Sequence, residues 1–172
     1  MKKPFKIAFT GPESSGKSTL ASWLSEEING AYCQEFAREY LSENKMYVQD
    51  DLVEIAKGQL NIWQSADAKK PLIADTELVV IEIWSKWKYK SCDDFIISNI
   101  LKQDFDFYFL CKPDIPWDYD PLRETPNDRE ELYQIYYETL SNYKFKFFIL
   151  EGNLVNRQKL VKQVLRDYGL VC

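Results

Sequence analysis

The chain has no histidine among its 172 residues, and this absence excludes several kinds of catalysis and metal binding. Ser-His-Asp and Cys-His mechanisms both need an imidazole, so a general base must be a carboxylate, an amine, a phenol or water. The four cysteines are scattered without the C-x-x-C spacing of zinc sites. We therefore interpret them as reduced thiols of a cytoplasmic protein: Cys33, Cys92, Cys111 and Cys172.

Long apolar runs and an excess of basic residues are also missing. No run approaches the roughly 18 residues of a membrane span, and the amino end leads directly into an apolar segment, so we expect a soluble, intracellular protein. Lysine and arginine total 22 against 27 aspartates and glutamates, which gives a net charge of −5 at pH 7. That balance disfavours a nucleic-acid partner, because backbone phosphates bind basic surfaces. It leaves the oligomeric state open.

Apolar residues make up 45% of the chain, enough for one globular domain over residues 1–172. Short apolar segments alternate with helical patterns, which favours a parallel sheet with crossover helices. The predicted strands are 5–9, 31–33, 72–75, 105–111 and 145–150. The helical patterns begin near residue 19 and continue at 35–41, 50–63, 132–140 and 161–168. Gly30 is expected to end the first helix.

The most informative segment reads G-P-E-S-S-G-K-S and lies between a predicted strand and a predicted helix. Glycines let backbone N–H groups point at phosphate oxygens, Lys17 reaches the terminal phosphates, and Ser18 offers a hydroxyl to Mg²⁺. The helix that follows turns its positive end toward the same anion. The sequence therefore predicts a phosphate loop that binds ATP and Mg²⁺ through Gly11, Glu13, Ser14, Ser15, Gly16, Lys17, Ser18 and Thr19.

Asp75 ends the apolar segment 72–74 and is the predicted second magnesium ligand. P-loop folds hold the metal with an acid at a strand end, opposite the loop hydroxyl. A helix cap is the alternative role. Thr76 and Glu77 continue the polar cluster and are predicted to contact the substrate, water or metal.

Glu35, Arg38 and Glu39 follow the predicted second strand, at the carboxyl edge where open α/β sheets bind ligands. Residues three or four apart share a helix face, so a surface ion pair is one interpretation. The functional interpretation is that these residues bind the acceptor. Glu35 is then the favoured base for the acceptor hydroxyl and Arg38 orients the acceptor.

The segment 112–129 is rich in proline, aspartate and arginine, and we call it the lid segment. Arg123 and Arg129 are predicted to close over the phosphates and stabilise charge in the transition state. An ordinary solvated loop is the alternative. Trp117 either stacks on a planar base of the substrate or packs at the root of the lid segment.

Gly152 and Asn153 follow the last predicted strand, with Arg157 nearby. A backbone turn there could hold the purine ring of the nucleotide. Asn153 could equally be only the N-cap of the final helix. Farther back in the chain, Trp84, Trp87 and Tyr89 are expected to fill the core, with an interface as the alternative.

Four motifs in order carry a family resemblance: G-P-E-S-S-G-K-S-T-L, E-F-A-R-E-Y-L, A-D-T-E with Trp84 downstream, and P-D-I-P-W before Arg123. Together they resemble the ribosylnicotinamide kinase domain of NadR-type NAD-salvage proteins, from residue 7 to about 157. The resemblance implies a P-loop kinase fold, with a five-stranded parallel sheet flanked by helices and a lid. It also implies transfer of the γ-phosphate of ATP to the 5′-hydroxyl of nicotinamide riboside, with the site residues in the roles given above.

Three functions therefore compete. The first is a nucleoside kinase whose favoured acceptor is nicotinamide riboside. The second is a nucleotide monophosphate kinase or another small-molecule kinase of the same architecture. The third is a regulatory ATP- or GTP-binding switch, which Cys111-Lys112-Pro113-Asp114 favours because GTPases place a guanine clamp after a strand. The clamp's asparagine is missing there, so ATP is preferred.

Overall fold

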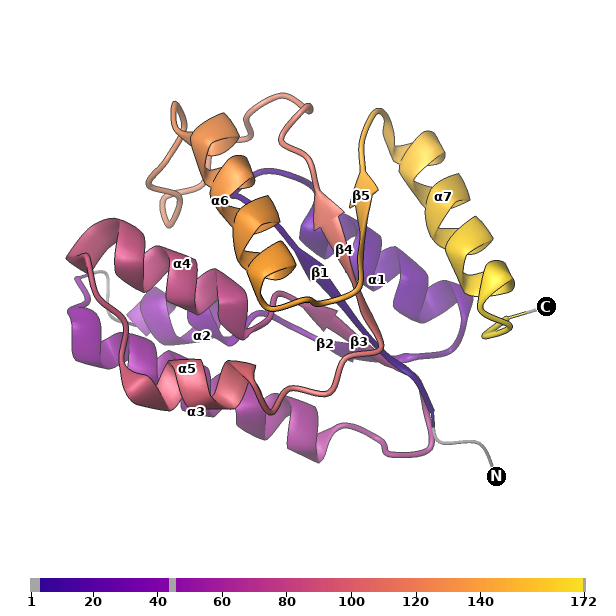
Figure 1. The fold of residues 1–172 in the computed structure, drawn as a ribbon, viewed down its shortest axis with the longest axis horizontal. Coiled ribbons are helices and arrows are strands. Elements are labelled where there is room, and N and C mark those ends of the chain that lie inside the picture. The colour runs from indigo at the N-terminus through magenta and orange to yellow at the C-terminus, as the bar shows by residue number, and fades with distance from the viewer. Residues whose placement is uncertain (1–3, 44–45, 172) are drawn as a thin grey trace.

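The computed structural model describes residues 4–43 and 46–171 and contains one five-stranded sheet (Figure 1). All neighbouring strands run parallel, in the order β2-β3-β1-β4-β5. The strands are β1 (Lys6–Thr10), β2 (Ala31–Cys33), β3 (Leu72–Asp75), β4 (Phe107–Cys111) and β5 (Phe147–Leu150). The expected α/β architecture is confirmed, although β4 and β5 each begin two residues later than the apolar pattern predicts.

Seven helices cover the sheet within the described residues. They are α1 (Lys17–Glu27), α2 (Phe36–Glu43), α3 (Gln49–Ser65), α4 (Leu78–Tyr89), α5 (Asp94–Ile100), α6 (Arg129–Asn142) and α7 (Leu154–Asp167). The helical patterns of the sequence predicted neither α4 nor α5. Helix α4 buries residues all around its circumference, so its apolar positions lack the one-sided spacing that reveals an amphipathic helix.

The two faces of the sheet carry separate apolar cores. Ile7 and Phe9 of β1 point into a core formed with α1 and α7, whereas Ala8 points to the opposite side. That side packs against α2, α3, α4, α5 and α6. Figure 1 shows α1 and α7 on one side of the sheet and most of the other helices on the far side. Alternate residues of a strand point to opposite faces, which explains the near-continuous apolar character of the strands.

The end of α1 differs in detail from the prediction. Asn29, not Gly30, adopts the left-handed conformation, with φ of 52°. The Gly30 amide then donates to the Ser25 carbonyl at 2.8 Å, which closes the helix end. Asparagine tolerates this conformation better than most residues, so the residue that ends the helix is Asn29, one position before the predicted Gly30.

Helix α2 is seated on α3 through an unusually close contact. A Cβ added to Gly58 of α3 would lie 2.1 Å from the ring of Phe36, so only glycine fits there. Beside it, the buried Gln59 side chain accepts from the Phe36 amide at 2.9 Å and donates to the Gln34 carbonyl at 3.1 Å. These contacts fix the start of α2, the segment that carries Glu35 and Arg38.

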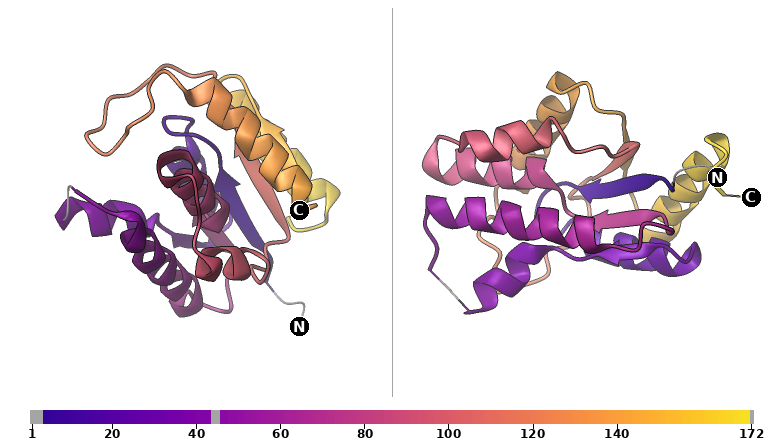
Figure 2. Two further views of the ribbon diagram at one scale, coloured as in Figure 1. Left: turned by 60° about the vertical axis from the view of Figure 1, so that its left-hand side comes forward. Right: turned by 90° about the horizontal axis from the view of Figure 1, so that it is seen from below.

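The carboxyl ends of β1, β3 and β4 meet at one edge of the sheet, where open α/β sheets bind ligands. The lid segment projects from that edge beside the indigo loop that follows β1 (Figure 2).

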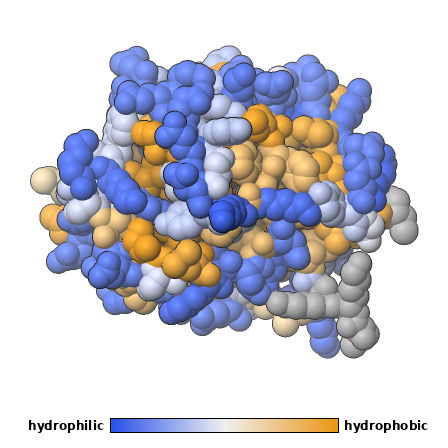
Figure 3. Space-filling model, in the orientation of Figure 1, coloured by the Kyte–Doolittle hydropathy of each residue, from blue (hydrophilic) through white to orange (hydrophobic). Residues whose placement is uncertain are grey.

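Strand β5 forms one outer edge of the sheet and its first three residues are only half-buried. Orange apolar surface is visible there, between α6 and α7 (Figure 3). None of the helices within residues 4–43 and 46–171 combines the length and the apolar character of a membrane span.

Candidate active site

The phosphate loop follows β1 directly and leads into α1. Gly11 has φ of 130°, and a Cβ there would lie 2.6 Å from the Cys111 carbonyl oxygen, so glycine lets the loop pass over the end of β4. Gly16 precedes α1 with φ of 88°. The Lys17 ammonium donates to the Pro12 carbonyl at 2.7 Å. The strand, loop and helix arrangement that the motif requires is therefore present, with a helix N-terminus facing the loop.

The side chains of Glu13 and Ser14 lie toward the lid segment. The Glu13 carboxylate accepts from the Glu124 and Thr125 amides, and the Ser14 hydroxyl accepts from the Asp118 amide at 2.9 Å. Both residues were predicted to bind the nucleotide. In the structure their side chains tie the phosphate loop to the lid segment, which leaves phosphate contact to their backbone.

Ser18 and Asp75 line one cavity of about 530 Å³, which we call the polar cavity. Its other walls are Tyr32, Gln34, Glu35, Arg38, Glu39, Asp120 and Arg123. Asp75 is 2% exposed, and the Tyr32 hydroxyl donates to its Oδ2 at 3.1 Å. Its Oδ1 is buried with no hydrogen-bond partner in the described part of the chain.

A serine hydroxyl and one carboxylate with a spare oxygen suit Mg²⁺, which keeps several waters and binds substrate phosphates as well. The described residues contain no group of three or more acids or cysteines that could hold a metal without such help. Ser18 and Asp75 therefore fit the ion in chemistry and in position. Asp75 ends β3 and caps no helix, because Glu77 caps α4.

Glu35 stands at the junction of the polar cavity and a second cavity, with its side chain 22% exposed. Burial raises the pKa of this carboxyl, and the negative charge of Asp75 raises it further, while Lys17 and Arg38 act in the opposite direction. Arg38 pairs with Glu35 at 3.4 Å and with Asp120 of the lid segment at 2.7 Å. The predicted ion pair is present, and it lines the cavities.

The second cavity, about 170 Å³, lies between the phosphate loop and three helices, and we call it the apolar cavity. Its apolar walls are Ala37 and Leu41 of α2, Val80, Ile83, Trp84 and Trp87 of α4, Leu122 of the lid segment, and Leu132 and Tyr136 of α6. Trp84, Trp87 and Tyr89 pack against the core as expected, and the two tryptophans also line this cavity. Both tryptophans are partly buried and face the cavity.

Thr76 and Glu77 lie behind the site. The fully buried Glu77 carboxylate accepts from the Thr10 hydroxyl at 2.8 Å, the Val79 amide at 2.7 Å and the Gln103 amide group at 3.0 Å. Glu77 therefore braces the end of β1 and the start of α4, and it lines neither cavity, in contrast to its predicted substrate contact. Thr76 has φ of 78° and is 2% exposed, so it is equally withdrawn from both cavities.

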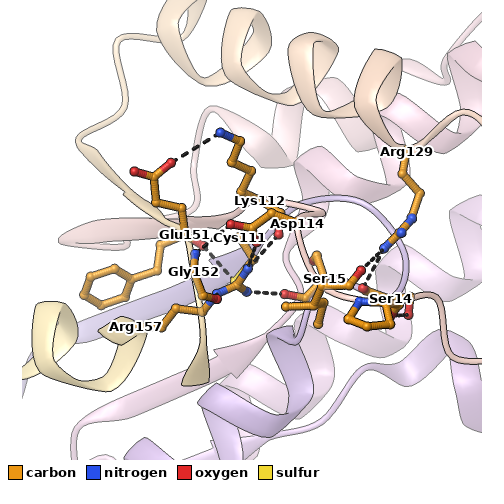
Figure 4. A network of polar contacts seen from close by, with 12 residues as sticks. Ser14, Ser15, Cys111, Lys112, Asp114, Arg129, Glu151, Gly152 and Arg157 are labelled. Carbon is orange, nitrogen blue, oxygen red and sulfur yellow. Dashed lines mark hydrogen bonds and ion pairs between the residues drawn. The ribbon is translucent and has the colours of Figure 1, made fainter. Parts of the chain in front are cut away.

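The lid segment places its two arginines differently. Arg123 lines both cavities and donates to the Asp118 carbonyl. Arg129, at the start of α6, donates to the Ser14 and Ile115 carbonyls at 3.0 and 3.1 Å (Figure 4). Trp117 lies against both guanidinium groups, 5.9 and 5.5 Å from its ring centre, so it packs at the root of the lid segment. Arg123 is therefore the lid arginine that faces the site.

Arg157 is 2% exposed and lies beneath the phosphate loop. Figure 4 shows its guanidinium between the chain at Gly152 and the phosphate loop. It donates to the Gly152, Ser15 and Lys112 carbonyls and pairs with Asp114. These contacts occupy the guanidinium, so its role is to hold the loop rather than to touch a purine.

In the turn after β5, Asn153 is the N-cap of the final helix, α7, which was the alternative to its predicted role in nucleotide binding. Its side chain accepts from the Asn156 amide at 2.9 Å and caps α7. The Gly152 amide donates to Asp114 at 2.6 Å.

Tyr32 and the apolar residues of α4 and α6 line the cavities but were not predicted from the sequence, because they look like ordinary strand and core positions there. The one sequence feature that pointed to the apolar cavity is the cluster of two tryptophans and one tyrosine within residues 84–89.

The comparisons with known proteins agree with this geometry. A family described as AAA domain matches residues 6–157. The chain belongs to this family. It is 29% identical over 185 residues to the trifunctional NAD biosynthesis/regulator protein NadR of Salmonella typhimurium, covering 97% of this chain and 45% of that protein. The chain thus spans less than half the length of this curated relative.

Two solved structures share the fold. A NadR protein in complex with NAD and AMP-PNP superposes with a TM-score of 0.81 at 19% identity, covering 98% of this chain and 51% of that one. A NadR protein in complex with NR gives a TM-score of 0.79 at 20% identity, covering 98% and 52%. The resemblance to NadR seen in the four motifs is thereby confirmed, and so is the expected P-loop fold with its five-stranded parallel sheet.

Proposed function

We propose that this chain is an ATP-dependent nucleoside kinase that moves the γ-phosphate of ATP to the 5′-hydroxyl of nicotinamide riboside. One observation carries the proposal. The apolar cavity and the polar cavity share Ser18, Glu35, Arg38 and Arg123, so a flat ring in one cavity would leave its sugar at the phosphate loop. The products are nicotinamide mononucleotide and ADP.

The apolar cavity suits a cationic aromatic ring. The nicotinamide ring of the riboside is a flat pyridinium, and Trp84, Trp87 and Tyr136 offer aromatic surfaces to it. Cations bind favourably over such rings, best over tryptophan. Glu35 adds negative charge to the wall of the same cavity. A neutral purine or pyrimidine nucleoside would gain less from this carboxylate.

Glu35 is the proposed general base. It lines both cavities, and its raised pKa brings the carboxylate closer to the basicity that proton transfer near neutral pH requires. In the proposed step the 5′-oxygen forms a bond to the γ-phosphorus while Glu35 accepts the hydroxyl proton. The bond from the γ-phosphorus to the bridging oxygen breaks, and ADP leaves with that electron pair.

The phosphate loop holds the triphosphate in this proposal. The Lys17 ammonium exchanges the Pro12 carbonyl for phosphate oxygens, and the backbone amides of the loop supply the remaining donors. Ser18 and Asp75 would hold Mg²⁺, which when bound neutralises charge on the phosphate oxygens. Arg123 faces the same region from the lid segment and stabilises charge on the transferred group.

The charge balance of the cavities disfavours a nucleotide monophosphate as acceptor. Arg38 is paired with two carboxylates, and Arg123 lies 3.5 Å from the Asp118 carboxylate. A monophosphate would have to displace these partners, whereas a nucleoside needs no cation. The NadR relatives are described as trifunctional, and the chain spans under half of the Salmonella protein, so the proposal covers phosphoryl transfer alone.

The proposal also includes one domain over residues 1–172, a small-molecule partner and a cytoplasmic location. The cysteines that the structure describes, Cys33, Cys92 and Cys111, are all free thiols, which suits a reducing compartment. The net charge of −5 continues to disfavour nucleic acid.

A product assay tests the function. The protein is incubated with ATP, Mg²⁺ and a panel of nucleosides and monophosphates, and phosphorylated product and ADP are quantified by chromatography. We expect nicotinamide mononucleotide and ADP in equal amounts, with little ADP when the acceptor is omitted. Product from a monophosphate would support the second function, and GTP preference without any phosphorylated acceptor would support the switch.

A further inference from the structure

Glu13 belongs to the phosphate loop, yet its carboxylate accepts hydrogen bonds from the lid segment. Its Oε2 accepts from the Glu124 amide at 3.0 Å, the Thr125 amide at 3.0 Å and the Thr125 hydroxyl at 2.8 Å. Its Oε1 lies 3.2 Å from the Glu124 amide. These contacts join residues 111 and 112 positions apart, so the loop motif itself fixes a distant segment.

The amides that Glu13 holds come directly after Arg123, the lid arginine that lines both cavities. On the other side of Arg123, Asp120 forms an ion pair with Arg38 of α2 at 2.7 Å. The Asp120 carboxylate also accepts from the Leu122 amide at 2.9 Å. Arg123 is thereby anchored three residues before and one residue after its own position. Its backbone cannot move far without breaking contacts to α2 or to the phosphate loop.

A carboxylate inside a phosphate loop needs an explanation, because it would repel a triphosphate. Charge-assisted hydrogen bonds are about twice as strong as neutral ones, and three donors satisfy much of the acceptor capacity of this group. The lid segment therefore both masks the negative charge of Glu13 and gains its own anchor from it. Glycine or serine at this position would leave Glu124 and Thr125 without that anchor.

We propose that Glu13 is a positioning residue that latches residues 124–125 to the phosphate loop and thereby holds Arg123 where the two cavities meet. This inference rests on the proposed kinase function for its catalytic consequence. The latch itself is a property of the ligand-free protein. The two parts can therefore be tested separately.

The first experiment measures amide hydrogen exchange in the full chain without ATP or acceptor. Glu13→Ala removes every acceptor of the latch, so the Glu124 and Thr125 amides should exchange at least about tenfold faster than in the wild type. Thr125→Val removes only the hydroxyl donor and should give a smaller increase at the same amides. Glu138→Ala removes an exposed acid of α6 and serves as the control for charge. Unchanged exchange in Glu13→Ala overturns the latch.

The second experiment is a double-mutant cycle with Arg123→Ala, measured as kcat and as KM for ATP and for nicotinamide riboside. Glu13→Ala should lower kcat about 10- to 100-fold in the wild-type background, because a misplaced group near the reaction costs about this much. In the Arg123→Ala background the same change should cost less than about threefold. Equal losses in both backgrounds overturn the positioning role. A wild-type protein without phosphotransfer would refute the kinase function, and the exchange experiment would then still decide the latch.

Discussion

The two cavities of this protein differ in the side chains that line them and in how they were found. The polar cavity combines a serine, carboxylates and arginines from the start of α1, the end of β3, the start of α2 and the lid segment, most of them in polar segments that stand out in the sequence. The apolar cavity is formed by aromatic and aliphatic residues of α2, α4 and α6, which looked like core. Under the proposed function this difference corresponds to two roles: the polar cavity handles charge and proton transfer, and the apolar cavity selects the ring of the acceptor.

The largest expected effect tests the phosphate side. Lys17→Ala removes the ammonium that reaches the terminal phosphates, so kcat should fall by about 10³-fold or more. The side chain lies on the ligand side of the loop, and the thermal unfolding midpoint should stay close to that of the wild type. Transfer rates are measured by product chromatography and folding by circular dichroism. Near-normal turnover would show that this loop is not the catalytic one.

Glu35→Gln tests the polar cavity at its junction with the apolar one. We expect kcat to fall about 10²-fold or more with ATP binding retained, because the amide cannot accept the hydroxyl proton. In the wild type the rate should rise with pH as the carboxyl deprotonates, and the raised pKa of Glu35 moves this rise to higher pH than for an exposed glutamate. The variant should lose that rise. An unchanged rate and pH profile would assign the base role to Glu39, Asp75 or water.

Trp84→Ala tests the apolar cavity. Loss of an aromatic face should raise KM for nicotinamide riboside about tenfold, while KM for ATP changes little, because cation–π contacts contribute about 0.5–2 kcal/mol. Trp84→Phe should restore part of the loss. Steady-state kinetics with each substrate varied in turn separates the two KM values. An equal rise in both would mean that Trp84 supports the fold and does not select the acceptor.

The smallest effect concerns Glu77, which lies outside both cavities and should alter stability more than catalysis. Burial raises its pKa from 4.5 to about 7, although hydrogen bonds from Val79, Gln103 and Thr10 lower it. The folded protein therefore keeps this proton up to about pH 7, whereas the unfolded chain loses it near pH 4.5. The free energy of unfolding should consequently fall as pH rises across this window, by up to a few kcal/mol.

Urea titrations at pH 5.5 and pH 8 measure that dependence. Glu77→Gln stays neutral at both values, so the stability difference between them should shrink relative to the wild type. Glu138→Gln is the matched control on the exposed face of α6. An undiminished difference in Glu77→Gln would assign the pH dependence to other groups.

Much of the fold followed from local patterns. The phosphate loop is specified by the backbone needs of Gly11 and Gly16, and Asp75 follows an apolar strand, so both were predictable from neighbouring residues. Glu77 and Arg157 belong to the same polar segments, but their roles depend on partners far away in the chain, such as Thr10 and Ser15. A one-dimensional pattern contains no information about such partners.

The apolar cavity was missed for a different reason. Apolar residues on a buried helix look the same in sequence whether they face other side chains or an enclosed space. Trp84 and Trp87 were assigned to the core because packing is the commoner use of aromatic residues. Only the relative placement of α2, α4 and α6 shows that these rings border a cavity.

The ring of Phe36 fits against Gly58, where no side chain is present. A mutation at Gly58 can therefore reduce activity although this residue contacts neither proposed substrate. Even alanine there would push the ring outward and tilt the beginning of α2. A screen for inactivating mutations should therefore recover substitutions on the face of α3 that contacts α2. Changes at this contact also offer a way to alter the acceptor range without replacing a residue of either cavity.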